Sequence, residues 1–188
     1  KYTGYVTDAV NGSDIDKRDG EVIVSVGGGA VGHKLLRVAL DCRSICMLKD
    51  RKWFFLLGPQ GNRHCELLDA HAMNKDITIE RNRSDFPVML HNCALSLSQG
   101  GYNTIVEILK ARAPAVIVPF SQGGETEQGL RARLLEERGL VKTLDENLLS
   151  PYTLAAKVDS AFSNSLPELS IDLNGAKKTA DFLLEWVA

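Results

Sequence analysis

Apolar and polar positions follow two alternating periods along most of this chain. Short runs of consecutive apolar residues, rich in β-branched and aromatic side chains, are typical of strands buried on both faces. Each run is followed by a segment whose apolar residues recur at helical spacing. The predicted strands are residues 21–26, 53–57, 76–80, 94–98, 115–118 and 140–144. The predicted helices are residues 33–47, 67–71, 84–90, 103–110, 126–138, 151–162 and 176–187.

This alternation predicts an α/β fold. Strands joined through helices lie parallel with right-handed crossovers, so we expect a doubly wound, Rossmann-like parallel sheet of about six strands with helices on both faces. Ser84 and Ser150 are the predicted N-caps of two helices, and Pro151 suits the first helical position. Ligands of such sheets bind beyond the carboxyl ends of the strands, near the point where strand order reverses. The loops of interest therefore follow Val26, Leu57, Glu80, Ser98 and Val118.

Net charge and hydropathy argue against two classes of function, nucleic-acid binding and membrane spanning. The 188 residues contain 22 Lys and Arg against 24 Asp and Glu, a net charge of −2. No basic excess favours nucleic acid or anionic lipid, and no apolar run approaches the roughly 20 residues that span a bilayer. We expect a cytoplasmic protein with no nucleic-acid partner and no transmembrane segment. The chain begins with Lys1 rather than Met, which we interpret as a fragment of a longer protein.

The four cysteines are too few for a disulfide scaffold of this length. Cys42 and Cys46 are four residues apart in a helical pattern, which places both thiols on one face. No Cys-x-x-Cys or paired histidine spacing accompanies them, so buried thiols are favoured over a zinc site. The other two are Cys65 and Cys93.

A glycine-rich loop, residues 27–32, follows the first core strand and opens a helix. Gly27, Gly29 and Gly32 satisfy the spacing Gly-x-Gly-x-x-Gly. Glycines let backbone amides approach a phosphate, and the helix N-terminus adds partial positive charge. The predicted diphosphate-binding residues in this loop are Gly28, Gly29, Ala30 and Gly32.

The second strand of this unit argues against a dinucleotide. A dinucleotide site needs an acidic residue there to bind ribose, whereas the strand ends in residues 56–60, Leu-Leu-Gly-Pro-Gln. A nucleoside diphosphate is therefore favoured over NAD, with a purely structural turn left open. His33, directly after the loop, is the histidine placed to approach a diphosphate, and a structural role at the helix start is its alternative.

The second glycine loop, residues 98–104, again exposes amides at a predicted helix start. Its predicted diphosphate-binding residues are Gly100, Gly101, Asn103 and Thr104. Glu107 is expected in the first turn of that helix, where the helix dipole stabilises a carboxylate. Its two oxygens match the vicinal diol of a ribose, and a structural helix acid is the alternative interpretation.

The third loop, residues 119–128, offers acids and amides that suit sugar hydroxyls, which both donate and accept hydrogen bonds. The predicted sugar-binding residues are Gln122, Glu125, Glu127 and Gln128. In the alternative interpretation, Glu127 and Arg131 only form a surface ion pair at i,i+4 spacing.

These three loops, in this order, resemble the C-terminal domain of glycosyltransferases with the GT-B fold, most closely the MurG-like family, glycosyltransferase family 28. Residues 98–107 look like the family's glycine turn and ribose-binding glutamate, and residues 113–120 look like its characteristic strand. Glu127 and Gln128 occupy the place of its sugar-contacting Gln-Gln pair, while Arg131 stands where asparagine is usual. The run 123–128 is similar to a bacterial subgroup of predicted glycosyltransferases.

The resemblance implies that residues 1–188 form the donor-binding domain of an enzyme that transfers a hexose or N-acetylhexosamine from a nucleoside diphosphate sugar, with UDP-sugars favoured. Transfer would proceed with inversion, and loop amides and helix N-termini would stabilise the leaving diphosphate. No metal or other cofactor is expected, in agreement with the lack of an Asp-x-Asp motif. Main-chain groups near Arg81 and Asn82 would hold the base.

The resemblance also assigns acceptor binding and the catalytic base to an N-terminal domain outside this chain, so we expect the isolated chain to be inactive. The last helix, residues 176–187, either crosses to that domain or packs on its own sheet. A nucleotide-sugar epimerase or hydrolase, a partner subunit that completes a site with another chain, and a module without nucleotide binding are the alternatives.

Overall fold

A parallel sheet of six strands forms the centre of the structure, a computed structural model that describes residues 4–7, 19–26, 32–58, 74–81, 83–120, 126–169 and 171–187. The strand order is β3-β2-β1-β4-β5-β6, with all neighbours parallel. The doubly wound, Rossmann-like sheet predicted from the sequence is confirmed. The strands are β1 (Val22–Val26), β2 (Trp53–Leu57), β3 (Ile77–Arg81), β4 (Leu95–Ser98), β5 (Ala115–Ile117) and β6 (Lys142–Thr143).

Strand order reverses between β1 and β4, which lie side by side at the centre. Val22 pairs with Leu95 and Ser25 pairs with Ser98, so both strands end at nearly the same level. From β1 the chain continues outward to β2, and from β4 it continues in the opposite direction to β5. The loops that follow β1 and β4 therefore meet at one edge of the sheet, where ligands of this fold class bind.

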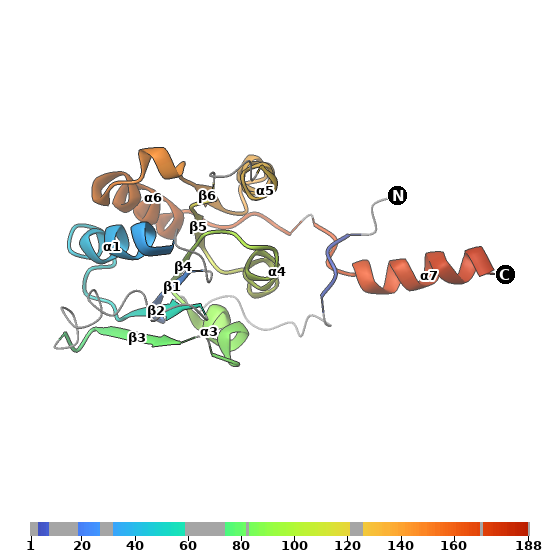
Figure 1. The fold of residues 1–188 in the computed structure, drawn as a ribbon, viewed down its shortest axis with the longest axis horizontal. Helices are drawn as coiled ribbons and strands as arrows, with labels where there is room; N and C mark the ends of the chain where they lie inside the picture. Colours follow the sequence, from blue (N-terminus) through green and yellow to red (C-terminus); the bar gives the residue numbers. More distant parts are fainter. Residues whose placement is uncertain are drawn as a thin grey trace.

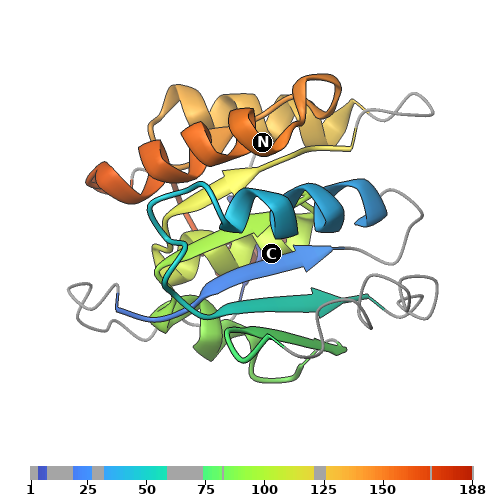
Figure 2. The same cartoon turned by 90° about the vertical axis from the view of Figure 1, so that its left-hand side faces the viewer.

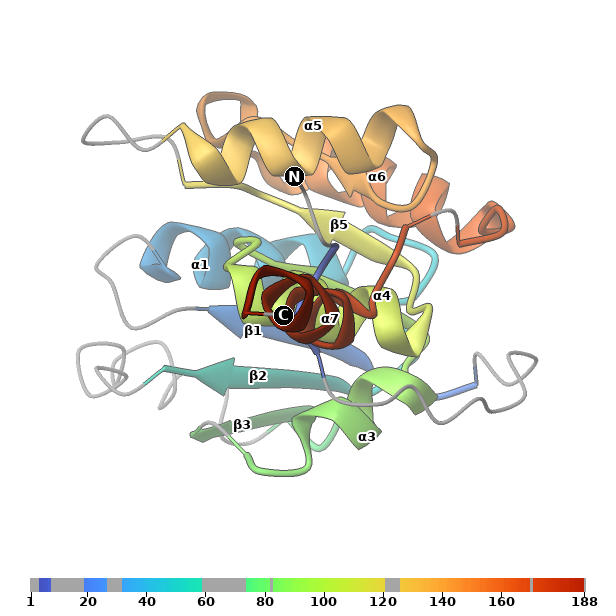
Figure 3. The same ribbon diagram turned by 90° about the vertical axis from the view of Figure 1, so that its right-hand side faces the viewer.

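Helices cover both faces of the sheet. In Figure 2, α1 (Gly32–Arg43) and α6 (Pro151–Ser163) lie across one face. Figure 3 shows the other face, covered by α3 (Phe86–Asn92), α4 (Tyr102–Ala111) and α5 (Glu127–Glu137). A 3₁₀ turn, η2 (Glu146–Leu148), precedes α6. The central strands are thus shielded from water on both sides, as continuous apolar runs predict.

Alternate side chains of the strands point to opposite faces of the sheet and pack into two separate hydrophobic cores. Val24, Phe55 and Leu97 belong to the core under α1 and α6. Ile23 and Ile117 belong to the core under α3, α4 and α5. Burial of each side chain of this size contributes about 1.5–3 kcal/mol to the stability of the fold, so the two cores hold the helices firmly against the sheet.

The N-terminal segment and the last helix meet beyond α4. Tyr5 N–H donates to the Asp172 carbonyl and Gly175 N–H donates to the Tyr5 carbonyl, both at 2.9 Å. From there α7 (Gly175–Val187) projects away from the sheet (Figure 1) and leaves Trp186 81% exposed. The alternative in which this helix packs on its own sheet is therefore wrong. Among the described residues, no helix is both long and apolar enough to cross a membrane.

Several helices and strands begin or end at other residues than predicted, and one predicted helix N-cap is wrong. α3 takes Asp85 rather than Ser84 as its N-cap, and the Asp85 carboxylate accepts hydrogen bonds from Arg83 instead of capping the helix. Ser150 caps α6 as predicted. The predicted helix 67–71 lies outside the described residues, and the strand predicted at 140–144 is reduced to β6.

The described cysteines are buried free thiols, as expected. They are Cys42, Cys46 and Cys93. Burial raises the pKa of the Cys93 thiol to about 12, which keeps it protonated and unreactive at neutral pH. Cys65 lies outside the described residues.

The partly buried carboxylate of Glu136 links α5, β6 and α6. Glu136 of α5 accepts the Thr143 N–H of β6 at 2.8 Å and contacts Lys157 of α6 at 3.4 Å. The Thr143 hydroxyl donates to the same carboxylate. Although partial burial opposes ionisation, the hydrogen bonds from Thr143 and the charge of Lys157 hold the pKa of Glu136 below its ordinary value.

We expect Glu136→Gln to lower the free energy of unfolding by about 1–2 kcal/mol at pH 7, since charge-assisted hydrogen bonds are lost. A lowered folded-state pKa stabilises the fold above the unfolded-state pKa, and this contribution disappears as pH falls through the folded-state pKa. Urea unfolding at pH 7 and pH 3 tests this, with Glu137→Gln as control because its pair with Arg133 is exposed. An equal effect of Glu136→Gln at both pH values would contradict the assignment.

Candidate functional site

Three helices begin at the carboxyl edge of the sheet, close to where strand order reverses. α1, α4 and α5 follow β1, β4 and β5, and their amino ends lie on the side to which the strand arrows point (Figure 2). Gly32 is the first residue of α1 and is buried, and half-buried His33 is the second. The other residues predicted in this loop, Gly28, Gly29 and Ala30, lie outside the described residues.

The β4–α4 turn depends on one glycine and leaves space at the next. Gly100 has a φ of +82°, and a Cβ atom there would lie 2.6 Å from the Ile117 Cγ2. Gly101, the N-cap of α4, has ordinary dihedral angles, and a Cβ there would meet no described atom within 4 Å. The turn therefore requires glycine at position 100, whereas position 101 keeps the helix N-terminus open to a ligand.

The amino end of α4 has the properties of an anion site. Its N-cap residue, Gly101, has no side chain with which to cap the helix, and the helix dipole favours negative charge there. Asn103 is exposed and Thr104 is half-buried in the first turn. The structure thus places four predicted diphosphate-binding residues together: Gly100, Gly101, Asn103 and Thr104.

Glu107 lies in the second turn of α4, so its predicted place in the first turn is wrong. The helix begins at Tyr102, and Glu107 is its sixth residue. Because the dipole effect falls off within the first turn, the helix acid interpretation loses its physical basis. The carboxylate instead pairs with Lys110 at 3.6 Å and is 25% exposed, which leaves it accessible to a ligand.

Glu127 and Gln128 lie at the amino end of α5. Gln128 Oε1 accepts the Phe120 N–H at 3.4 Å, so this side chain helps to close the β5–α5 connection. Glu127 forms an ion pair with Arg131, as the alternative interpretation expected, but the arginine is largely buried rather than at the surface. Gln122 and Glu125 lie outside the described residues.

At the end of β3, sequence reasoning missed a cluster of charges. Arg83 binds Glu80 at 3.0 Å and Asp85 at 2.7 Å. The hydrogen bonds from Arg83 hold the pKa of Asp85 below its ordinary value. The Glu-x-x-Arg-x-Asp spacing was the available signal. Arg81, predicted near the base, is the exposed last residue of β3, and Asn82 lies outside the described residues.

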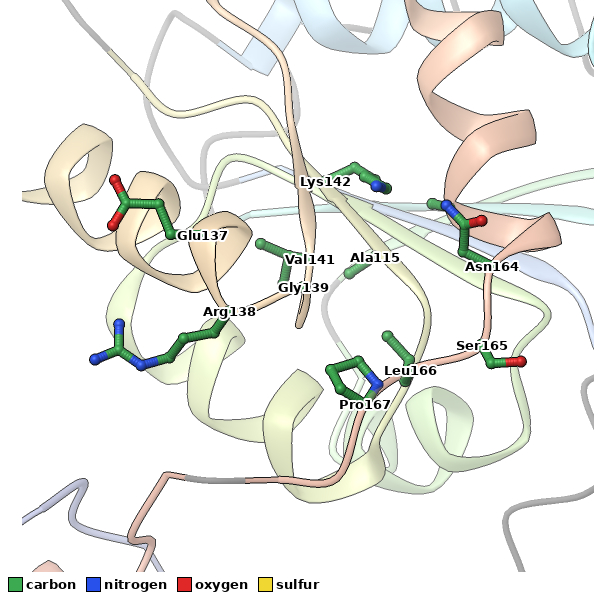
Figure 4. A pocket seen from close by; sticks show the side chains of 11 residues that line it. Ala115, Glu137, Arg138, Gly139, Val141, Lys142, Asn164, Ser165, Leu166 and Pro167 are labelled. Atoms are coloured by element: carbon green, nitrogen blue, oxygen red, sulfur yellow. The ribbon is translucent and has the colours of Figure 1, made fainter.

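A separate hollow of about 570 Å³ lies at the opposite edge of the sheet (Figure 4). Its lining includes Ala115 and Lys142, the first residues of β5 and β6, and the ends of α5 and α6. The Glu137 and Arg138 side chains point away from it (Figure 4). It shares no residue with the candidate site. The described residues contain no group of three or more His, Cys, Asp or Glu side chains placed to hold a metal ion.

Comparison with protein families gives a match over most of the chain. The model of the glycosyltransferase family 28 C-terminal domain matches residues 23–182. A curated relative from Clostridium botulinum (strain Alaska E43 / Type E3) is 25% identical over 166 residues, which is 87% of this chain and 45% of the relative. Its name is UDP-N-acetylglucosamine--N-acetylmuramyl-(pentapeptide) pyrophosphoryl-undecaprenol N-acetylglucosamine transferase. A protein of the same name from Alkaliphilus metalliredigens (strain QYMF) is 28% identical over 116 residues, 59% of this chain and 32% of that protein.

Solved structures share the fold. Acinetobacter baumannii MurG aligns with a TM-score of 0.61 and 18% identity, covering 90% of this chain and 51% of that chain. The spinosyn rhamnosyltransferase SpnG aligns with a TM-score of 0.62 and 17% identity, covering 88% and 41%. This chain spans less than half the length of the first curated relatives it matches.

We expect Gly100→Ala to lower the free energy of unfolding by about 1–3 kcal/mol, because alanine at positive φ is strained and its Cβ meets Ile117. The matched control is Gly101→Ala, which we expect to change stability by less than about 1 kcal/mol, since its dihedral angles and surroundings accept a methyl group. Urea unfolding of both variants measures the difference. Equal losses in the two would contradict this account of the turn.

Proposed function

The chain belongs to the family of glycosyltransferase family 28 C-terminal domains, and from this we propose that it is the nucleotide-sugar-binding part of a glycosyltransferase. In this proposal it holds the donor while a hexose or N-acetylhexosamine passes to an acceptor, with UDP-sugars favoured. The names of the matched relatives, which specify UDP-N-acetylglucosamine, support a uridine donor. The structural observation that carries the proposal is the α4 amino end, whose N-cap is a glycine, beside the point where strand order reverses.

The diphosphate would lie against the amino ends of α4 and α1. Negative charge develops on the departing nucleoside diphosphate during transfer, and preorganised N–H groups stabilise such charge without needing to reorganise. Gly101 leaves the space that close approach of a phosphate needs. We propose that these amides and the two helix dipoles carry this role, so that transfer needs no metal. We also propose, from the family resemblance, that transfer inverts the anomeric centre.

Glu107 would bind the ribose. It lies six residues beyond the Gly101 N-cap, which corresponds to roughly 9 Å along the helix axis. Helical side chains lean toward the helix N-terminus, so the carboxylate reaches back toward the diphosphate position. A carboxylate offers about four lone-pair sites, and the ion pair with Lys110 joins Nζ to Oε1 at 3.6 Å. Capacity remains for both hydroxyls of a ribose.

The remaining parts of the donor would lie on either side of α4. We propose that Glu127 and Gln128, at the α5 amino end, face the sugar and that main-chain groups near Arg81 face the base. An N-terminal half, with the acceptor site and the catalytic base, would complete the enzyme. The projecting α7 is consistent with further protein next to this domain.

We expect UDP to bind this chain and Glu107→Ala to weaken binding about 10- to 150-fold, because a charged hydrogen-bond partner of ribose is worth about 1.5–3 kcal/mol. Glu107→Gln keeps the shape and loses the charge, so its effect should be smaller. Isothermal titration calorimetry measures the affinity of the wild type and of both variants for UDP. Glu137→Ala, an exposed carboxylate at the far end of α5, is the control and should bind UDP as the wild type does.

Two results would contradict this proposal. One is that no uridine nucleotide binds at millimolar concentration while the chain is folded by circular dichroism. The other is that NAD binds more tightly than UDP, which would indicate a dinucleotide site.

A further inference from the structure

Arg131 is a residue of α5 whose side chain lies against the first residue of α4. Both helices begin at the candidate site. Its guanidinium Cζ is 5.3 Å from the ring centroid of Tyr102, the first residue of α4. It also forms an ion pair with Glu127, the first residue of α5. The Arg131 side chain is 11% exposed, whereas that of Glu127 is 75% exposed. A nearly buried cation therefore holds a carboxylate that reaches into solvent.

Tyr102 is itself fixed by the N-terminal segment. Its ring stacks on that of Tyr5, with centroids 5.7 Å apart and planes inclined by 25°. Its hydroxyl accepts the Val6 N–H at 3.2 Å. Burial raises the pKa of the Tyr5 phenol, and the charge of Arg131 opposes this rise.

A second ion pair on α5 is far more exposed than the pair of Glu127 with Arg131. Arg133 and Glu137 have the same i,i+4 spacing, but the atoms of that pair are 3.8 Å apart and the side chains are 69% and 61% exposed. Exposed pairs of this kind average over many rotamers and contribute little to stability. Arg131 is held by an aromatic ring and by burial, so the ion pair restricts Glu127 to few conformations.

We propose that Arg131 is a positioning residue that fixes the Glu127 carboxylate as a hydrogen-bond acceptor for a neutral donor sugar, with Tyr102 fixing Arg131 in turn. This inference rests on the proposed function. A carboxylate accepts hydrogen bonds and donates none when ionised, so it suits sugar hydroxyls and disfavours a sugar that carries a carboxylate. The arginine also offsets the charge of Glu127, which reduces repulsion of the donor diphosphate.

The test measures, by calorimetry, the ratio of the dissociation constant of UDP to that of UDP-N-acetylglucosamine. This ratio falls when binding of UDP-N-acetylglucosamine weakens selectively. We expect Arg131→Gln to weaken binding of UDP-N-acetylglucosamine about 5- to 10-fold relative to UDP, since losing the ion pair releases Glu127 from its position. Arg131→Lys keeps the charge and should restore part of the loss. Arg133→Gln is the matched control and should leave the ratio unchanged.

Two further comparisons separate positioning from a merely structural role. In a Glu127→Gln background, Arg131→Gln should have little additional effect on the ratio, because residues that act as one unit are not additive. Tyr102→Leu should lower the ratio more than Tyr102→Phe, which keeps the ring over the guanidinium.

Each outcome identifies what fails. If the wild type binds no UDP, the proposed function is wrong and this inference falls with it. If UDP binds but Arg131→Gln weakens UDP and UDP-N-acetylglucosamine equally, the donor site stands and the positioning role is wrong. If both Glu127→Gln and Arg131→Gln leave the ratio unchanged, neither residue acts on the sugar.

Discussion

The pairing of β1 with β4 is the constraint on which the rest of the structure depends. These strands are far apart in the sequence, yet Val22 pairs with Leu95 and Ser25 with Ser98. Because the chain leaves the two strands in opposite directions, their carboxyl ends form the switch point beside which ligands of this fold class bind. The amino ends of α1 and α4 are brought to this edge by the same pairing, so the main features of the candidate site follow from one packing arrangement.

The chemistry of this edge uses backbone more than side chains. Gly100 gives the turn its positive φ and Gly101 leaves space at the α4 amino end. In the proposed donor site, side chains would add selectivity at increasing distance from the turn, with Glu107 along α4 and Glu127 at the start of α5. This division suits a donor whose diphosphate is common to many substrates, while its ribose and sugar distinguish them.

The sequence predicted the sheet well because buried strands such as β2 read as continuous apolar runs. Competition between neighbouring polar side chains was harder to predict. Asp85 rather than Ser84 occupies the N-cap position of α3, and its carboxylate binds Arg83 instead of the helix N–H groups. The turn containing Glu107 was misplaced because the start of α4 depends on two glycines without a capping side chain. The stack of Tyr5 on Tyr102 joins residues 97 positions apart, and no local pattern reports such a contact.

In the proposed function, a uridine nucleotide binds at the carboxyl edge beside β1 and β4. Backbone amide chemical shifts, measured by NMR during titration of the ¹⁵N-labelled chain with UDP, test it residue by residue. The account predicts saturable shifts at Gly32, Gly101, Asn103 and Glu107. Shifts confined to the opposite edge, around Val141, Lys142 and Leu166, would contradict it.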